Sequence, residues 1–274
     1  MSAMTQSQPR MLGAYLQGIG LIGPGLTDWR SGARVIAGHE TYSPGATVVP
    51  APQGLTAAER RRTGATVRLA ISAAQQAVAD AGVDPAGLNA VFTSSGGDGL
   101  ICHEICETLA SADRQLSPTR FHNSVHNAAA GYWSLATGAT AASTALCAYD
   151  ASFSAGLLEA LALVTVDRVP VILSAYETSY PEPLRSKRPL PDSFAVAMVL
   201  APTPASSARA KLIVSICDGD TDRLSDPRLE ALRAALPAAR SLPLLRLLAR
   251  GESGRVVLDY LDERRVAVEV SECR

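Results

Sequence analysis

Short apolar runs alternate with segments of helical periodicity along most of the chain. Apolar runs bounded by turn residues are typical of buried strands, whereas apolar positions that recur every three to four residues are typical of amphipathic helices. The first pattern predicts strands at residues 12–22, 88–94, 139–149, 169–175, 193–200, 211–217, 255–260 and 265–270. The second predicts helices at residues 28–37, 57–81, 100–112, 127–138, 153–164, 227–236 and 242–249. We therefore predict an α/β protein whose central strands are covered on both faces.

The stretch from residue 127 to residue 164 is the part around which the rest of the chain is organised. It predicts a helix of small residues, a buried strand over residues 139–149, a tight turn and a second amphipathic helix. Asp150 stands at the turn between this strand and the second helix. We expect its carboxylate to accept the free N–H groups of the first helical turn as an N-cap, and a catalytic carboxylate is the weaker alternative.

Two further patterns mark the ends of elements. Thr56 and Glu59 form a capping box that opens a single long helix over residues 57–81, and Gly82 ends it. The glycine-rich turn at residues 95–99 follows a predicted strand but lacks the spacing of a phosphate-binding loop, so a tight turn is favoured. The proline-rich, basic segment 180–192 predicts a loop.

Composition excludes several classes of function. Of the 274 residues, 47% are hydrophobic and 19% charged, and the net charge of −1 provides no electrostatic basis for binding nucleic acid. No apolar run is expected to approach the length of a membrane span. The N-terminal residues show no signal pattern, so a cytoplasmic protein is expected. Five scattered cysteines, an odd number, indicate reduced thiols rather than a disulfide framework.

A zinc site is an alternative from another class of protein. Cys102 and Cys106, together with His122 and His126, superficially have the spacing of a Cys2His2 site. However, both cysteines lie in a segment with its own helical apolar pattern, and no other feature of a zinc ribbon is present. We therefore expect no metal.

Several segments resemble the N-terminal half of a β-ketoacyl synthase, a family with the thiolase fold. The resemblance covers about residues 12–204 and is carried by Asn127–Gly131, by the ungapped interval from Gly138 to Asp150, by Ser174–Glu177 and by Asp80–Gly82. It implies a layered α/β/α thiolase-like fold with a complete N-terminal half, 12–204, and a truncated C-terminal half, 205–274, that completes the sheet.

The departures from this family pattern concern its catalytic residues. The resemblance places Asp150 where the family has its acyl-accepting cysteine, and Cys147 lies three residues upstream. A carboxylate is a poor acyl carrier, since the family's chemistry requires a thiolate. The family also requires imidazole or amide side chains from its C-terminal half, yet the last histidine of this chain is His126. Cys147 is expected to be a buried small hydrophobe rather than a thiolate.

The resemblance therefore implies a non-catalytic subunit without a cofactor, similar to a chain length factor of the aryl polyene type. Such a subunit pairs with a catalytic β-ketoacyl synthase, shapes the acyl tunnel and serves an acyl carrier protein. The residues implied at the tunnel or dimer interface are Phe121, His122, Cys147, Tyr149, Asp150, Ser152 and Phe153. Those implied in carrier-protein docking are Arg60, Arg61 and Arg62, for which a solvated helix face is the alternative. A stand-alone condensing enzyme that uses Cys147, or an acyl- or carrier-protein-binding protein, remain alternative functions.

Overall fold

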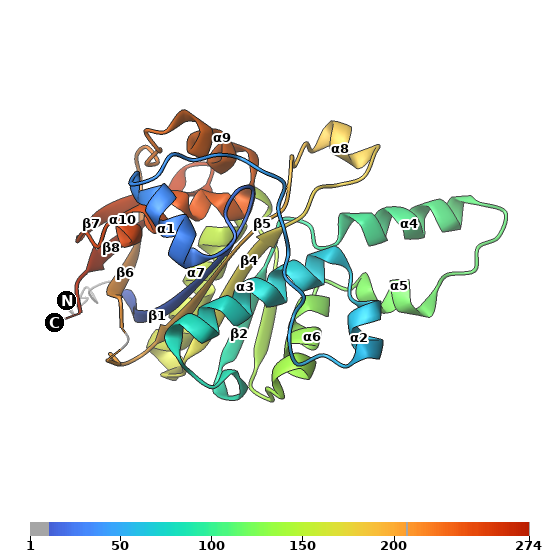
Figure 1. Cartoon of the computed structure of the whole chain (residues 1–274), viewed down its shortest axis with the longest axis horizontal. Coiled ribbons are helices and arrows are strands. Elements are labelled where there is room, and N and C mark those ends of the chain that lie inside the picture. Colours follow the sequence, from blue (N-terminus) through green and yellow to red (C-terminus); the bar gives the residue numbers. More distant parts are fainter. Residues whose placement is uncertain (1–10, 207, 274) are drawn as a thin grey trace, which may run out of the picture.

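The computed structural model describes residues 11–206 and 208–273, which form one eight-stranded mixed sheet (Figure 1). The strands lie in the order β3-β2-β4-β5-β1-β6-β8-β7. Their bounds are β1 Leu12–Ile22, β2 Asn89–Thr93, β3 Ser143–Leu146, β4 Val171–Glu177, β5 Phe194–Ala201, β6 Ala210–Cys217, β7 Gly254–Leu261 and β8 Arg264–Ser271. β2 runs parallel to both β3 and β4, and every other pairing is antiparallel.

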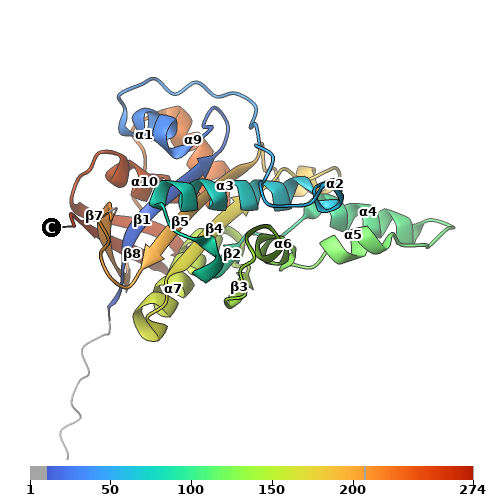
Figure 2. The same cartoon turned by 60° about the horizontal axis from the view of Figure 1, so that its bottom comes forward.

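Helices cover both faces of this sheet, as Figure 2 shows for α3 and α7. The longer helices are α1 Trp29–Ala37, α3 Ala65–Ala81, α4 Gly99–Ala110, α6 Ala128–Thr137, α7 Ser152–Ala162, α9 Pro227–Ala235 and α10 Leu242–Ala249. One hydrophobic core joins the sheet to α3 and α6, and the other joins it to α1, α7, α9 and α10. All positions of β4 and β5 are buried, because each strand has neighbours on both edges and helices on both faces. The predicted layered α/β/α fold is confirmed.

The segment predicted as one helix over residues 57–81 is two helices, so that prediction was wrong in part. The capping box of Thr56 and Glu59 is present, but it opens the six-residue helix α2, Ala57–Arg62. Thr63 is extended, and Gly64 is the N-cap of α3. Thr63 and Gly64, whose backbones are not helical, thus separate the exposed α2 from the buried α3. Gly82 ends α3 in the left-handed conformation, as predicted.

Glycines in β1 set how closely α3 lies against the sheet. A Cβ atom on Gly20 would overlap the Ala73 carbonyl of α3, and one on Gly18 would overlap the carbonyl of Ala77. This close approach explains why the apolar face of α3 is rich in alanine.

The strand before the elbow differs from its prediction. A buried strand over residues 139–149 was expected, whereas β3 comprises Ser143–Leu146, and these four residues are exposed or half-buried. β3 lies at the end of the strand order, so that β2 is its neighbour on one side and no strand of the described residues covers the other. Local hydrophobicity does not reveal that a strand lies at an edge.

The C-terminal residues extend the same sheet. β6 pairs with β1, and the predicted hairpin is present as β7 and β8, with β8 against β6. The boundary expected at residues 204 and 205 falls between β5 and β6.

Two segments project beyond the sheet. α4 and α5, Pro118–Asn123, form an arm at one end of the molecule (Figure 1). The predicted loop 180–192 contains a four-residue helix, α8, Leu184–Lys187.

The segment Tyr149–Asp167 is long and apolar enough to cross a membrane by length and composition alone, contrary to the expectation that no apolar run approaches that length. It comprises a short 3-10 turn, α7 and the π-helical turn Leu163–Asp167. Half of its apolar window is buried inside the protein, and Leu157, Leu161 and Val164 belong to the core between α7 and the sheet. These contacts are those of a core helix.

Candidate functional site

A strained turn connects β3 to α7. Tyr149 has a φ of +51°, a conformation that is rare for a residue other than glycine. The buried Ser152 holds the turn on both sides: its Oγ accepts a hydrogen bond from the Ala148 amide at 3.1 Å and donates one to the Tyr149 carbonyl at 2.7 Å. We refer to residues 147–152 as the elbow.

Asp150 does not cap α7, so the N-cap prediction was wrong. The N-cap position is Ala151, which provides no side-chain hydrogen bond. The Asp150 carboxylate instead accepts hydrogen bonds from Arg188 at 2.7 Å and from Arg240 at 3.0 Å. The arginine side chains are 17% and 21% exposed, and that of Asp150 is 38% exposed. In these two bonds both donor and acceptor are charged, whereas at an N-cap only the acceptor would be.

Arg188 binds the elbow through two contacts. Besides its ion pair with Asp150, its guanidinium lies over the Tyr149 ring, 3.8 Å from the ring centroid. Burial acts to lower the pKa of Arg188, but the hydrogen bond and the charge of Asp150 outweigh burial, and the pKa lies above its ordinary value. The loop that carries α8 is thereby joined to the elbow.

The expectation that Cys147 is a buried hydrophobe was wrong. Cys147 is exposed, because it follows β3, an edge strand. Its Sγ donates a hydrogen bond to the Ser95 carbonyl at 2.9 Å.

A buried carboxyl group lies behind the elbow. Ser95 donates to Glu177 twice, from its amide at 2.6 Å and from its hydroxyl at 2.7 Å. Glu177 is 2% exposed, and burial raises its pKa to about 7; the bonds from Ser95 and the charge of Arg188 only partly oppose this rise. Glu177, Ser95 and Cys147 form a continuous hydrogen-bonded chain from the end of β4 to the end of β3.

The other residues expected at the interface occupy two environments. Phe121 is 62% exposed on α5, and His122 contacts the Tyr132 ring edge-on at a centroid distance of 6.2 Å. Ser152 and Phe153 are each 1% exposed and are buried within the chain itself. The structure therefore brings Cys147, Tyr149 and Asp150 together at the elbow, places Phe121 and His122 on the arm, and keeps Ser152 and Phe153 inside.

The three arginines of α2 are all exposed. Arg60 donates to the Leu55 carbonyl at 2.7 Å, so it is in part a structural residue. Asn123 of α5 donates to the Arg62 carbonyl at 2.6 Å and connects α2 to the arm.

No group of three or more histidine, cysteine or acidic side chains with metal-binding geometry occurs among the described residues. Cys102 and Cys106 are exposed on α4, where His103 instead pairs with Glu107 at 3.3 Å and Glu104 with Arg120 at 2.9 Å.

An open cavity of about 900 Å³ lies beside the elbow. Tyr149, Asp150 and Arg240 line one part of it, and the turn between β7 and β8 lines another. Arg188, Arg240, Ser95 and Glu177 were not assigned to the site from the sequence. Arg188 lies in the basic segment 180–192, whereas no local pattern distinguishes Arg240.

Residues 34–257 match the sequence model of the β-ketoacyl synthase N-terminal domain. No curated protein sequence matches the chain. A ketosynthase (ApeO) in complex with its chain length factor (ApeC) from Xenorhabdus doucetiae contains a chain with a TM-score of 0.71 and 22% identity, and the similarity covers 94% of this chain and 99% of that one.

Two further solved structures share the fold. The ishigamide ketosynthase/chain length factor has a TM-score of 0.69 at 13% identity, with 95% of this chain and 99% of that chain covered. The AntDE:AntF complex, a type II polyketide acyl carrier protein with its ketosynthase, has a TM-score of 0.70 at 11% identity, with 96% and 100% covered. At these identities the similarity concerns the fold.

Proposed function

The chain belongs to the family of β-ketoacyl synthase N-terminal domains, and from this premise we propose that it is a non-catalytic subunit that pairs with a catalytic β-ketoacyl synthase. In this role it resembles a chain length factor: it contributes a surface to the acyl tunnel of its partner and condenses no carbon–carbon bond itself. We further propose that the complex acts in the cytoplasm, on polyene-type chains held by an acyl carrier protein.

The pairing of Asp150 with two arginines is the observation that carries this proposal. The elbow holds a carboxylate that two arginines bind, and a carboxylate in two ion pairs is neither a thioester carrier nor a free base. The nearest thiol, that of Cys147, donates a hydrogen bond to the Ser95 backbone carbonyl. No histidine follows His126 in the sequence, so the imidazole that would assist condensation has no counterpart in the C-terminal half.

The free edge of β3 supports the proposal that another chain binds here. The Ala90 amide donates to the Ala142 carbonyl and the Ser94 amide to the Leu146 carbonyl, so even-numbered residues of this segment face β2. Backbone groups of alternate residues in a strand face opposite edges, and Ser143 and Ala145 therefore direct theirs toward the free edge. An unpaired edge of this kind is a site for strand addition by another chain.

Exposed apolar side chains lie next to this edge in the sequence and on the arm. Tyr149 is 60% exposed, Phe121 62% and Val125 47%. Large exposed apolar side chains gain stability when a partner buries them. The similar chain from Xenorhabdus doucetiae, 99% of which is covered, comes from a complex of a ketosynthase with its chain length factor. This origin supports a partner of the ketosynthase type.

Co-expression with a ketosynthase encoded next to this chain tests the proposal. We expect the two polypeptides to elute as a 1:1 complex and the isolated chain to show no condensing activity. Two separately eluting proteins, each with condensing activity, would refute the proposal.

The exposure of Cys147 favours a second candidate function, a stand-alone condensing enzyme that uses this thiol. An acyl adduct on Cys147, detected by mass spectrometry after incubation with an acylated carrier protein and lost in Cys147→Ala, would establish this candidate instead.

A further inference from the structure

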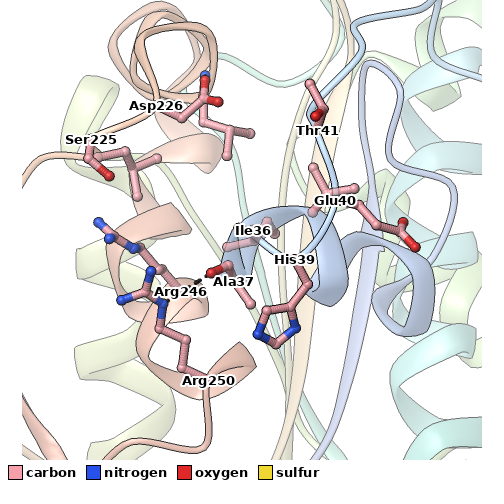
Figure 3. A pocket seen from close by; sticks show the side chains of 13 residues that line it. Ile36, Ala37, His39, Glu40, Thr41, Ser225, Asp226, Arg246 and Arg250 are labelled. Atoms are coloured by element: carbon pink, nitrogen blue, oxygen red, sulfur yellow. Dashed lines mark hydrogen bonds between the residues drawn. The ribbon is translucent and has the colours of Figure 1, made fainter.

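A cavity of about 250 Å³ opens between the end of α1 and the end of α10 (Figure 3). It shares no lining residue with the cavity beside the elbow. Its apolar floor includes Ile36 and Leu229, and its opening is lined by charged side chains. Figure 3 shows the guanidinium groups of Arg246 and Arg250 next to each other on one side, with the His39 ring nearby.

The two arginines are one helical turn apart and differ in how they are held. Arg250 donates from Nε to the Ala37 carbonyl at 3.2 Å, which fixes the direction of its guanidinium, and its nearest carboxylate is that of Glu252 at 3.9 Å. Within residues 11–206 and 208–273, Arg246 has no hydrogen bond or ion pair from its side chain. Like charges at this spacing destabilise a helix, and an anion bound between them relieves the repulsion.

A second cavity of about 270 Å³ adjoins the first and shares Arg246 and Arg250 with it. It adds Arg223 from the segment before α9 and Arg255 from the start of β7. Four arginines from three separate segments thus line these two adjoining cavities, which we refer to together as the depression. The negative partial charge at the end of α10 accounts for arginines in its last turn, but it does not account for Arg223 and Arg255.

Three of the four carboxylates around the depression are engaged elsewhere, and the fourth, Glu252, lies 3.9 Å from Arg250. Glu40 pairs with Arg34 at 2.7 Å. Asp226 caps α9 and accepts two of its backbone N–H groups. Asp222 accepts the Val257 amide at 2.7 Å. The guanidinium groups of Arg246 and Arg250 are therefore not neutralised by strong ion pairs within the described part of the chain.

We propose that this depression is a binding site for a phosphate group, with Arg246 and Arg250 as its principal ligands. A guanidinium presents two parallel N–H donors that match two phosphate oxygens, and adjacent arginines bind phosphate more strongly than isolated lysines do. Each cavity is large enough for a phosphate with a short organic substituent. Both inorganic phosphate and a small phosphate monoester share this chemistry. The site is independent of the proposed partner role, since none of its residues belongs to the elbow, β3 or the arm.

Titration of the full chain with inorganic phosphate, at constant ionic strength in chloride, tests the proposal by calorimetry. We expect saturable binding that weakens about tenfold or more in Arg246→Ala, because the paired guanidinium contact is lost. Arg246→Lys keeps the positive charge but lacks the two parallel N–H donors, and we expect an intermediate affinity. Arg114→Ala, an exposed arginine between α4 and α5, is the matched control and should bind as the unchanged chain does.

A parallel titration with phosphoethanolamine distinguishes the two sources of phosphate. Tighter binding of this monoester than of inorganic phosphate would identify a substituted ligand, and the reverse order would identify the free anion; each result supports the site. Circular dichroism of each variant establishes whether it is folded. If Arg246→Ala does not fold, the comparison is made with Arg246→Lys. Heats that fail to saturate, or equal affinities in the unchanged chain and in the folded Arg246 variant, would overturn the proposal.

Discussion

Arg188 donates a hydrogen bond to the Asp150 carboxylate at 2.7 Å, although the two residues are 38 positions apart. Arg240, a further 52 positions along the chain, binds the other carboxylate oxygen at 3.0 Å. One side chain at the elbow therefore connects the loop that carries α8 and the 3-10 turn before α10 to the end of β3. The Asp150 carboxylate is thus a structural joint between these three segments.

Removing this joint is expected to lower the stability of the fold. Asp150→Ala leaves two largely buried guanidinium groups without their anion, and we expect a loss of about 2 kcal/mol, a figure that allows for the partial exposure of Asp150. Urea unfolding measures it. Asp218→Ala, which removes an exposed ion pair with Arg264, is the control and should cost less than about 1 kcal/mol. Equal losses in the two variants would contradict a structural role of the joint.

The elbow illustrates how far the sequence alone predicts the site. The end of an apolar run followed by helical spacing correctly predicted a strand-to-helix turn at residue 150, because that information is local. The partners of Asp150 are distant in sequence, and no periodicity encodes which arginine folds back onto the turn. The burial of Cys147 failed as a prediction for a related reason: whether a strand lies at the centre or the edge of a sheet depends on the other strands.

Glu177 predicts a dependence of stability on pH. Its pKa is about 7 in the folded protein, above its ordinary value of 4.5, because the carboxyl is buried. Between these two values the unfolded chain has released a proton that the folded chain retains, so stability falls as the pH rises from 4.5 through 7. The full effect is about 3 kcal/mol at most. Glu177→Gln remains neutral, and we expect its stability relative to the unchanged chain to rise over this range in urea unfolding.

A carboxylate with the opposite shift is the control for this measurement. Hydrogen bonds from Thr56 lower the pKa of Glu59, so its contribution to stability is present above its ordinary pKa and is lost on acidification. Glu59→Gln should therefore change the pH profile only at the acid end. A Glu177→Gln profile parallel to that of the unchanged chain from pH 4.5 to 8 would show that Glu177 does not titrate as described.

The free edge of β3 provides a test of partner binding that preserves the fold. Ala145 directs its backbone N–H away from β2, so Ala145→Pro removes a donor from the free edge and leaves the pairing with β2 intact. We expect the complex with the ketosynthase to weaken at least about tenfold, as measured by analytical ultracentrifugation, because strand addition depends on these main-chain bonds. Ala145→Ser retains the N–H and should bind normally. Unchanged affinity in a folded Ala145→Pro variant would place the interface elsewhere.

The arginines of α2 differ in their suitability for docking a carrier protein. Arg61 and Arg62 are exposed, and no hydrogen bond of their side chains occurs within the described residues, whereas Arg60 donates to the Leu55 carbonyl. Replacing both Arg61 and Arg62 by glutamate should weaken binding of the acidic carrier protein about tenfold and reduce its salt dependence. The same reversal at Arg30, exposed on α1, is the control. A reversal at Arg30 that weakens binding as much as the double variant would indicate general electrostatics rather than a docking site.

Cys147 reports directly on whether a partner covers the elbow. Its thiol is exposed in the isolated chain and follows the last residue of β3, so strand addition to β3 would shield it. We expect iodoacetamide to label Cys147 in the isolated chain and labelling to slow roughly tenfold or more in the complex, since interfaces exclude solvent from their centres. Cys217, half-buried at the end of β6 several strands away from β3, provides an internal reference in the same mass spectrum. Because both thiols experience the same reagent, their ratio is independent of reagent concentration. A ratio that stays constant when the ketosynthase binds would mean that the partner does not contact the edge strand, even if the two chains form a complex.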